Sequence, residues 1–164
     1  MKEHIAYEDA IDLLDADHKS VKKLFLEFAE LCQDESSVDR KSSVARQICD
    51  ALKSHTQIEE EIFYPAVDAA IPDANLINEA RAEHAEVAQI IARIEGMMPS
   101  NRAFDATVMQ LGKLVEQHVL KEREQIFLKA SRAALDLRDM TRPLLKRRQQ
   151  LAKQAAAVAV KESA

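Results

Sequence analysis

The sequence predicts an all-α fold: an antiparallel, up-down-up-down four-helix bundle with an additional C-terminal helix. Only two glycines and four prolines occur in 164 residues, too few for the turns of a β-sandwich, a barrel or a doubly wound sheet. Tryptophan is absent and aromatic residues make up 4% of the chain, while 47% of it is apolar, a composition typical of helical proteins. Four long segments also repeat apolar residues at alternating steps of three and four, as a buried helix face requires.

The first two predicted helices lie on either side of a polar segment. The apolar stripe of the first covers residues 11–32 and that of the second covers residues 44–66, with polar residues at 33–37 between them. Pro72 ends the second helix, because a proline disfavours helical geometry at the residue before it. Asp73 then has the side chain expected of an N-cap for the third helix.

The third and fourth stripes cover residues 77–98 and 104–126, separated by a Met-Pro-Ser-Asn segment. Loops this short join antiparallel neighbours, because a parallel pair needs a connection as long as a helix. We therefore expect residues 1–134 to form the bundle and residues 135–164 to form a basic C-terminal helix and tail.

The C-terminal segment differs in charge from the bundle. Its basic residues are Arg138, Arg142, Lys146, Arg147, Arg148 and Lys153. We expect a fifth helix that packs Leu137, Met140, Leu144 and Leu145 against the bundle. A docking surface for an acidic protein partner or a lipid is the alternative interpretation of the same segment.

Net charge and targeting signals restrict the possible functions. The charge of −5 at pH 7 argues against a general nucleic-acid binder. No apolar run follows Lys2 and no stretch of 18 apolar residues occurs, so neither a signal peptide nor a membrane span is predicted. Cys32 and Cys49 form no Cys-x-x-Cys motif. We expect a cytoplasmic protein with neither nucleic-acid nor membrane partners.

Four of the five histidines occupy the apolar stripes. His4 precedes the first helix and is expected to be solvated, whereas the others fall one on each stripe, near its midpoint: His18, His55, His84 and His118. A core stripe covers about three positions in seven, so chance gives this pattern about once in 30. His55 and His118 are followed at i+4, on the same helix face, by Glu59 and Glu122. In an antiparallel bundle, all six side chains meet in one core layer.

A buried layer of six polar side chains indicates a metal site. A single buried histidine is more often a hydrogen-bonded core residue, but each polar group buried without partners costs about 1–3 kcal/mol. A cation removes this cost, and imidazole and carboxylate without thiolate suit iron, manganese or zinc. Four imidazoles and two bridging carboxylates suffice for two ions. Ferritin-like sites are disfavoured, because they use Glu-x-x-His pairs in the opposite order.

The motif around the second-helix histidine resembles that of a known family. The segment reads His55-Thr-Gln-Ile-Glu59-Glu60-Glu61-Ile-Phe-Tyr64-Pro65, and the order along the chain is H, HxxxE, H, HxxxE. Both features are similar to those of hemerythrin-like, HHE cation-binding domains, over residues 8–131. The resemblance implies two iron ions in the bundle core, with zinc or manganese as alternatives. Their ligands would be His18, His55, Glu59, His84, His118 and Glu122, with the two glutamates bridging the irons.

One departure from this family concerns the third helix. Oxygen-carrying hemerythrins place a fifth histidine one turn from the third-helix ligand, whereas the one-turn neighbours of His84 are Ala80 and Ala88. Glu83 and Glu86 are expected to point away from the helix seam. The resemblance then implies an open position on each iron, which argues against reversible oxygen carriage.

The resemblance implies a non-haem diiron protein that acts on O2, hydrogen peroxide or nitric oxide, and it favours catalase-like breakdown of peroxide. An iron- or oxygen-sensing module without turnover is the alternative, in which the basic C-terminal helix reports occupancy to a partner. A zinc-filled bundle without redox chemistry is a third reading.

Three residues near Glu59 are expected to lie outside the metal layer. On an ideal α-helix, Glu60 and Glu61 rotate about 100° and 200° away from the stripe, so both are predicted to be solvated or to occupy outer positions. Tyr64 is expected at the rim of the pocket, packed under the next loop.

Overall fold

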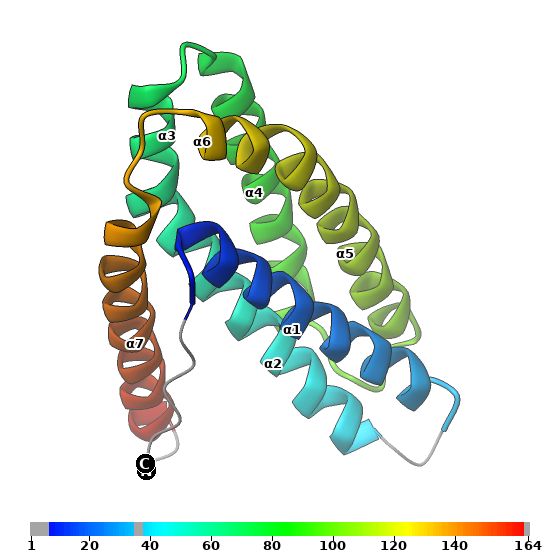
Figure 1. The fold of residues 1–164 in the computed structure, drawn as a ribbon. Helices are drawn as coiled ribbons and strands as arrows, with labels where there is room; N and C mark the ends of the chain where they lie inside the picture. The colour runs from blue at the N-terminus through cyan, green and yellow to red at the C-terminus, as the bar shows by residue number, and fades with distance from the viewer. Residues whose placement is uncertain (1–6, 35–37, 163–164) are drawn as a thin grey trace.

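The computed structural model describes residues 7–34 and 38–162, and His4 lies outside them. The described chain is helical and confirms the predicted all-α bundle. Helix α1 (Ala10–Leu31) lies beside α2 (Val38–Ile58), and α4 (Ala74–Glu95) lies beside α5 (Arg102–Lys121) (Figure 1). These two helix pairs face each other and form the bundle.

Two of the bundle helices change their winding near the middle of the molecule. Helix α2 continues through the π-helical segment η1 (Glu59–Phe63) into α3 (Tyr64–Ala70). Helix α5 continues in the same way through η2 (Glu122–Phe127) into α6 (Leu128–Arg132). Both π-helical segments of the described chain therefore begin at one of the two glutamates of the predicted metal layer.

Side-chain caps fix where the helices begin. Asp73 accepts a hydrogen bond from the backbone N–H of Leu76, which confirms the predicted start of the third bundle helix. Asp9 caps α1 and Asn101 caps α5 in the same manner. Each cap satisfies a backbone donor that the helix itself leaves without a partner.

Helix α7 (Leu137–Glu162) packs against α1, α2 and η1, on the side of the bundle away from α5 (Figure 1). Leu144 is fully buried there, and Leu137, Met140 and Leu145 pack around the same cluster. This confirms the predicted apolar contact of the C-terminal helix. Among the described residues, no helix is long and apolar enough to cross a membrane.

The apolar core is divided into two clusters. One includes Val21, Phe28, Ile48, Ile91 and Leu111. The other includes Leu13, Ile58, Tyr64, Ile77 and Phe127, and α7 packs onto it. The positions between these clusters are occupied by buried histidines and glutamates. A polar layer therefore crosses the whole bundle at mid-height.

Candidate metal centre

The four predicted histidines meet in this layer as two pairs. All four rings are buried. The Nε2 atoms of His18 and His55 lie 3.1 Å apart, and those of His84 and His118 also lie 3.1 Å apart. Because each ring turns its Nε2 toward the bundle axis, four nitrogen atoms converge from four different helices.

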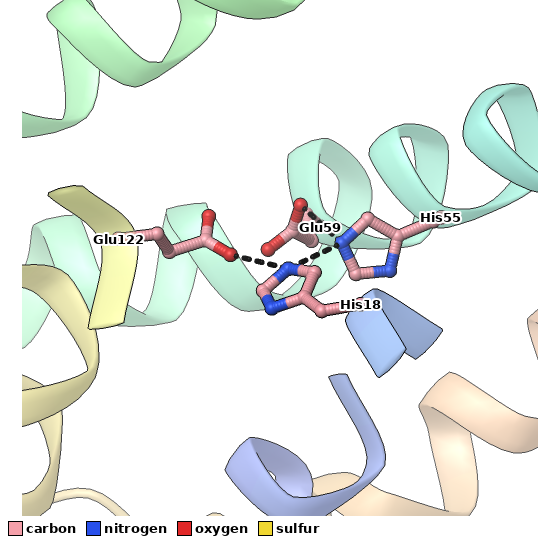
Figure 2. Close-up of side chains that lie close together, drawn as sticks. All are labelled: His18, His55, Glu59 and Glu122. Carbon is pink, nitrogen blue, oxygen red and sulfur yellow. Dashed lines mark hydrogen bonds and ion pairs between the residues drawn. The ribbon is translucent and has the colours of Figure 1, made fainter. Parts of the chain in front are cut away.

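The two glutamates connect the histidine pairs. Glu59 Oε1 lies 3.0 Å from His55 Nε2 and 3.4 Å from His84 Nε2. Glu122 Oε1 lies 3.1 Å from His18 Nε2, and its Oε2 lies 3.4 Å from His118 Nε2. Figure 2 shows Glu59 and Glu122 converging on the first pair. Each carboxylate thus reaches one histidine of each pair.

These contacts leave three of the four carboxylate oxygens without hydrogen bonds. Both oxygens of Glu59 and Oε1 of Glu122 are buried and have no hydrogen-bond partner, because the close nitrogens do not have hydrogen-bond geometry. The donor atoms form two overlapping groups, within each of which all atoms lie within 4.8 Å of one another. One group is His18, His55, Glu59 and Glu122, and the other is Glu59, His84, His118 and Glu122. Unpaired buried oxygens facing inward-turned imidazoles fit a pair of cations.

Tyr64 is not the rim residue that the sequence suggested. It is fully buried, and its hydroxyl donates a hydrogen bond to Glu122 Oε2 and lies 3.2 Å from His84 Nε2. The reason is the π-helical turn, in which the Tyr64 backbone N–H donates to the Glu59 carbonyl five residues back. The wider turn brings Tyr64 beneath Glu59 on the core face, whereas an ideal α-helix would rotate it away.

The second π turn has the same effect on Phe127, which stands five residues after Glu122. Phe127 is buried and stacks on His18 with ring centroids 5.7 Å apart, while Tyr64 stacks on His84 at 5.3 Å. The two halves of the layer are therefore alike in arrangement. They differ in chemistry, because only the tyrosine brings a hydroxyl to the glutamates.

An outer set of carboxylates orients the histidine rings. Three Nδ1 atoms face a carboxylate at 3.0–3.4 Å: His18 faces Asp15, His55 faces Asp17 and His118 faces Glu83. His84 Nδ1 lies 3.5 Å from Glu60 without a hydrogen bond. A carboxylate at the outer nitrogen holds the proton there, which leaves the inner nitrogen free to bind a metal.

The surroundings of His84 partly correct the sequence prediction. Ala80 is buried beside the layer, whereas Ala88 is exposed and faces away from it. Glu86 is exposed, as expected. Glu83 does not point away from the seam but reaches the outer nitrogen of His118, because α4 and α5 pack closely along this face.

Comparison with known proteins identifies the fold. A family model, the hemerythrin HHE cation binding domain, matches residues 9–130. The chain belongs to this family. The fold is also that of a solved hemerythrin HHE cation binding domain-containing protein from Mycobacterium kansasii, with a TM-score of 0.78 and 19% identity. That match covers 91% of this chain and 90% of the other.

A curated protein is similar to this HHE domain over part of its length. It is a DNA nickase of Nostoc sp. (strain PCC 7120 / SAG 25.82 / UTEX 2576), 28% identical over 116 residues. The match covers 71% of this chain and 32% of the nickase. The chain thus spans about a third of the length of that relative.

In the metal-free HHE domain, histidines and glutamates shift one another's pKa values. Burial lowers the pKa of His118, but the close contact with Glu122 and the negative charge of Glu122 outweigh burial and raise it to about 9. For His55, burial is likewise outweighed by the Glu59 charge and the Asp17 hydrogen bond, so its pKa is raised well above the ordinary value. Burial raises the pKa of Glu122, yet its close contacts with His118 and His18 hold that pKa well below the usual range.

These shifts predict how the stability of the metal-free domain depends on pH. A histidine with a raised pKa contributes stability fully below its unfolded pKa near 6.5 and loses it as the pH rises through the folded pKa, about 9 for His118. Glu122 contributes stability above its ordinary pKa of 4.5, and this stability is lost as the pH falls through its lowered pKa in the folded state. The free energy of unfolding should therefore fall between pH 6.5 and 9.

Thermal unfolding of chelator-treated protein, followed by circular dichroism at pH 6.5 and 9, measures this effect. His118→Ala is the control, since it removes one of the histidines whose pKa is raised. The free energy of unfolding of this variant should therefore fall less between the two pH values. Metal-loaded protein should show the opposite trend, because protons compete with metal for the same nitrogens. A metal-free stability that rises from pH 6.5 to 9 would contradict the histidine shifts.

The position of Glu59 predicts a second result. Glu59→Ala removes a donor common to both groups, so the domain should retain fewer metal ions after dialysis than the wild-type protein. Glu61→Ala is a matched control, because Glu61 is surface-exposed and pairs with Arg147. Metal per chain, measured by plasma emission spectroscopy, should be unchanged in the control. Equal metal loss in both variants would mean that the wrong helix face was assigned.

Proposed function

We propose that this HHE domain holds two iron ions and breaks down hydrogen peroxide. The observation that carries the proposal is the pair of overlapping donor groups that share Glu59 and Glu122. His18 and His55 would complete one iron site, and His84 and His118 the other. Histidine and carboxylate donors with no thiolate suit non-haem iron, and two shared carboxylates hold two ions close together.

The residues around His84 favour peroxide chemistry over oxygen carriage. Ala80 occupies the buried one-turn position and offers no donor atom, so the second group contains no more histidines than the first. A small cavity beside Ala80 is lined by His118 and Glu122. A second cavity, lined by all four histidines and by Val21, Leu52, Val87, Val115 and Val119, has a volume of about 20 Å³. Space for about one water molecule suits a ligand as small as peroxide.

A bound iron pair would pass two electrons from one peroxide molecule to another, and Tyr64 is the group in this layer placed to handle a proton. Its hydroxyl hydrogen points at Glu122 Oε2, and its oxygen lies 3.2 Å from His84 Nε2. Burial and the charges of Glu59 and Glu122 raise the pKa of Tyr64, so the phenol keeps its proton at neutral pH. Tyr64 therefore holds a proton beside the position that His84 and His118 would complete, where the cleavage of an O–O bond requires one.

The test of the proposed function is peroxide consumption by iron-loaded protein. We expect about one O2 released for every two peroxide molecules consumed, measured with an oxygen electrode and peroxide absorbance. Metal analysis of the same sample should give two irons per chain. Spectra recorded through cycles of air and argon should show no reversible oxygen adduct. Reversible oxygenation without turnover above that of free iron, or a colourless protein that holds only zinc, would refute the proposal.

A further prediction concerns the proton on Tyr64. Tyr64→Phe keeps the ring that stacks on His84 but removes the hydroxyl, so both irons should remain bound while peroxide turnover falls. Loss of a positioned proton donor typically costs about 10²-fold or more in rate. Ser131→Ala is the control, because it also removes a hydroxyl, and the exposed Ser131 hydroxyl donates only to the Leu128 carbonyl of its own helix. Wild-type turnover by Tyr64→Phe would show that its proton is not used.

A sensing role without turnover is the second candidate, and one observation favours it. Arg148 of α7 binds Asp17, which is the carboxylate that orients His55. The C-terminal helix is thus connected to the layer that would hold the metal.

A further inference from the structure

Two neighbouring arginines attach α7 to the bundle in different ways. Arg147 pairs with Glu61, an exposed side chain of η1 that also accepts a hydrogen bond from Gln57. Arg148 instead turns inward and donates to Asp17 Oδ1 on α1. Its guanidinium also lies 3.4 Å from the Tyr7 hydroxyl and over the Tyr7 ring, 5.9 Å from the ring centroid. The two arginines are equally exposed, each at 27% of the side chain.

Asp17 joins Arg148 to the histidine layer. Its second oxygen, Oδ2, lies 3.0 Å from His55 Nδ1, while Oδ1 accepts from Arg148. One carboxylate therefore connects three helices: α7 through Arg148, α1 through its own backbone, and α2 through His55. The Asp17 side chain is 16% exposed while Arg148 is paired with it, so removal of the arginine would open this carboxylate to water.

We infer that Arg148 is a positioning residue of the metal centre, which acts through Asp17 on His55. Hydrogen bonds between charged groups are about twice as strong as neutral ones. Arg148 therefore holds Asp17 in the orientation that keeps the outer His55 nitrogen protonated and the inner nitrogen turned toward the metal position. Without Arg148, Asp17 can rotate toward solvent, and His55 loses the contact that fixes its ring.

The effect is confined to one half of the layer. His55 belongs to the donor group with His18, whereas the other group takes its outer contact from Glu83, which pairs with Lys121. Within the described part of the chain, neither Glu83 nor Lys121 makes a hydrogen bond to α7. Loss of Arg148 should thus weaken one metal position and leave the other unchanged. This inference rests on the metal centre proposed above.

The coupling must also act in reverse. If docking of α7 raises the affinity for metal, bound metal raises the stability of the docked α7 by the same factor. Metal occupancy would then be transmitted to the C-terminal helix. This supplies a physical route by which a binding module reports its state to a partner.

The experiment compares Arg148→Met with Arg147→Met in the full chain. Each variant removes one arginine and one ion pair between α7 and the bundle, and only the first ion pair leads to a histidine. Calorimetric titration of the metal-free proteins with Co²⁺, supported by visible spectra of the bound cobalt, measures the two positions separately. In Arg148→Met we expect one affinity about tenfold weaker, at the lower end of outer-contact effects on metal binding. Arg147→Met should keep both cobalt affinities at the wild-type values.

Three further variants separate positioning from packing. Arg148→Lys keeps the charge and one hydrogen bond, so part of the lost affinity should return. Asp17→Asn should weaken the same position, and adding Arg148→Met to it should cause little further loss, since both act through one contact. Circular dichroism of each metal-free variant verifies that the bundle is folded. If the double variant instead loses as much cobalt affinity as the two single variants together, the inference is wrong.

Hydrogen exchange tests the reverse direction. Co²⁺ should slow amide exchange over residues 137–151 in the wild-type protein and in Arg147→Met, but much less in Arg148→Met. Equal cobalt affinities in the two arginine variants, or equal weakening of both positions, would overturn the role of Arg148 and leave the proposed metal centre intact. If the wild-type protein binds no cobalt or iron, the proposed centre fails, and the inference fails with it.

Discussion

The structure of this protein depends on two buried carboxylates whose oxygens are mostly left without hydrogen bonds. Glu59 and Glu122 are fully enclosed between two apolar clusters, and three of their four oxygens have no hydrogen-bond partner. Burying an unpaired ion costs several kcal/mol even after relaxation, which is a large part of the stability of a domain this size. Without metal, the neighbouring histidines offset this cost only by keeping protons, as the raised pKa of His118 indicates. A bound cation offsets the same cost without protonation of the histidines, so this layer of the bundle fits a metal.

The sequence predicted the six members of this layer because each follows a regular α-helical stripe. The prediction was wrong for Tyr64, where the regular helix ends. The π turn that begins at Glu59 adds a residue to the winding, and no local pattern in the sequence marks such a turn. Glu83 was misplaced for a different reason, since a helical wheel gives a direction but not the distance between packed helices. The pair formed by Asp17 and Arg148 joins residues 131 positions apart, which periodicity cannot detect.

The two halves of the layer repeat one arrangement with one chemical difference. In each half a histidine stacks on an aromatic ring that stands five residues after a glutamate, at Tyr64 and Phe127. A π turn in each helix is therefore part of how the site is built, since it brings this ring onto the core face. Only Tyr64 adds a hydroxyl, which makes the environment of the two ion positions unequal. The donor group that contains His84 therefore has a proton close by that the group containing His18 lacks.

The size of the coupling through Arg148 decides what kind of signal α7 can carry. A tenfold change in metal affinity corresponds to about 1.4 kcal/mol, whereas burial of a single leucine contributes about 1.5–3 kcal/mol. Leu144 is fully buried, and four other apolar residues of α7 pack around the same cluster: Leu137, Met140, Leu145 and Leu151. Loss of metal therefore cannot release α7 from the bundle. It raises the frequency of local opening about tenfold, and a partner that binds the opened helix would respond in a graded manner to metal occupancy.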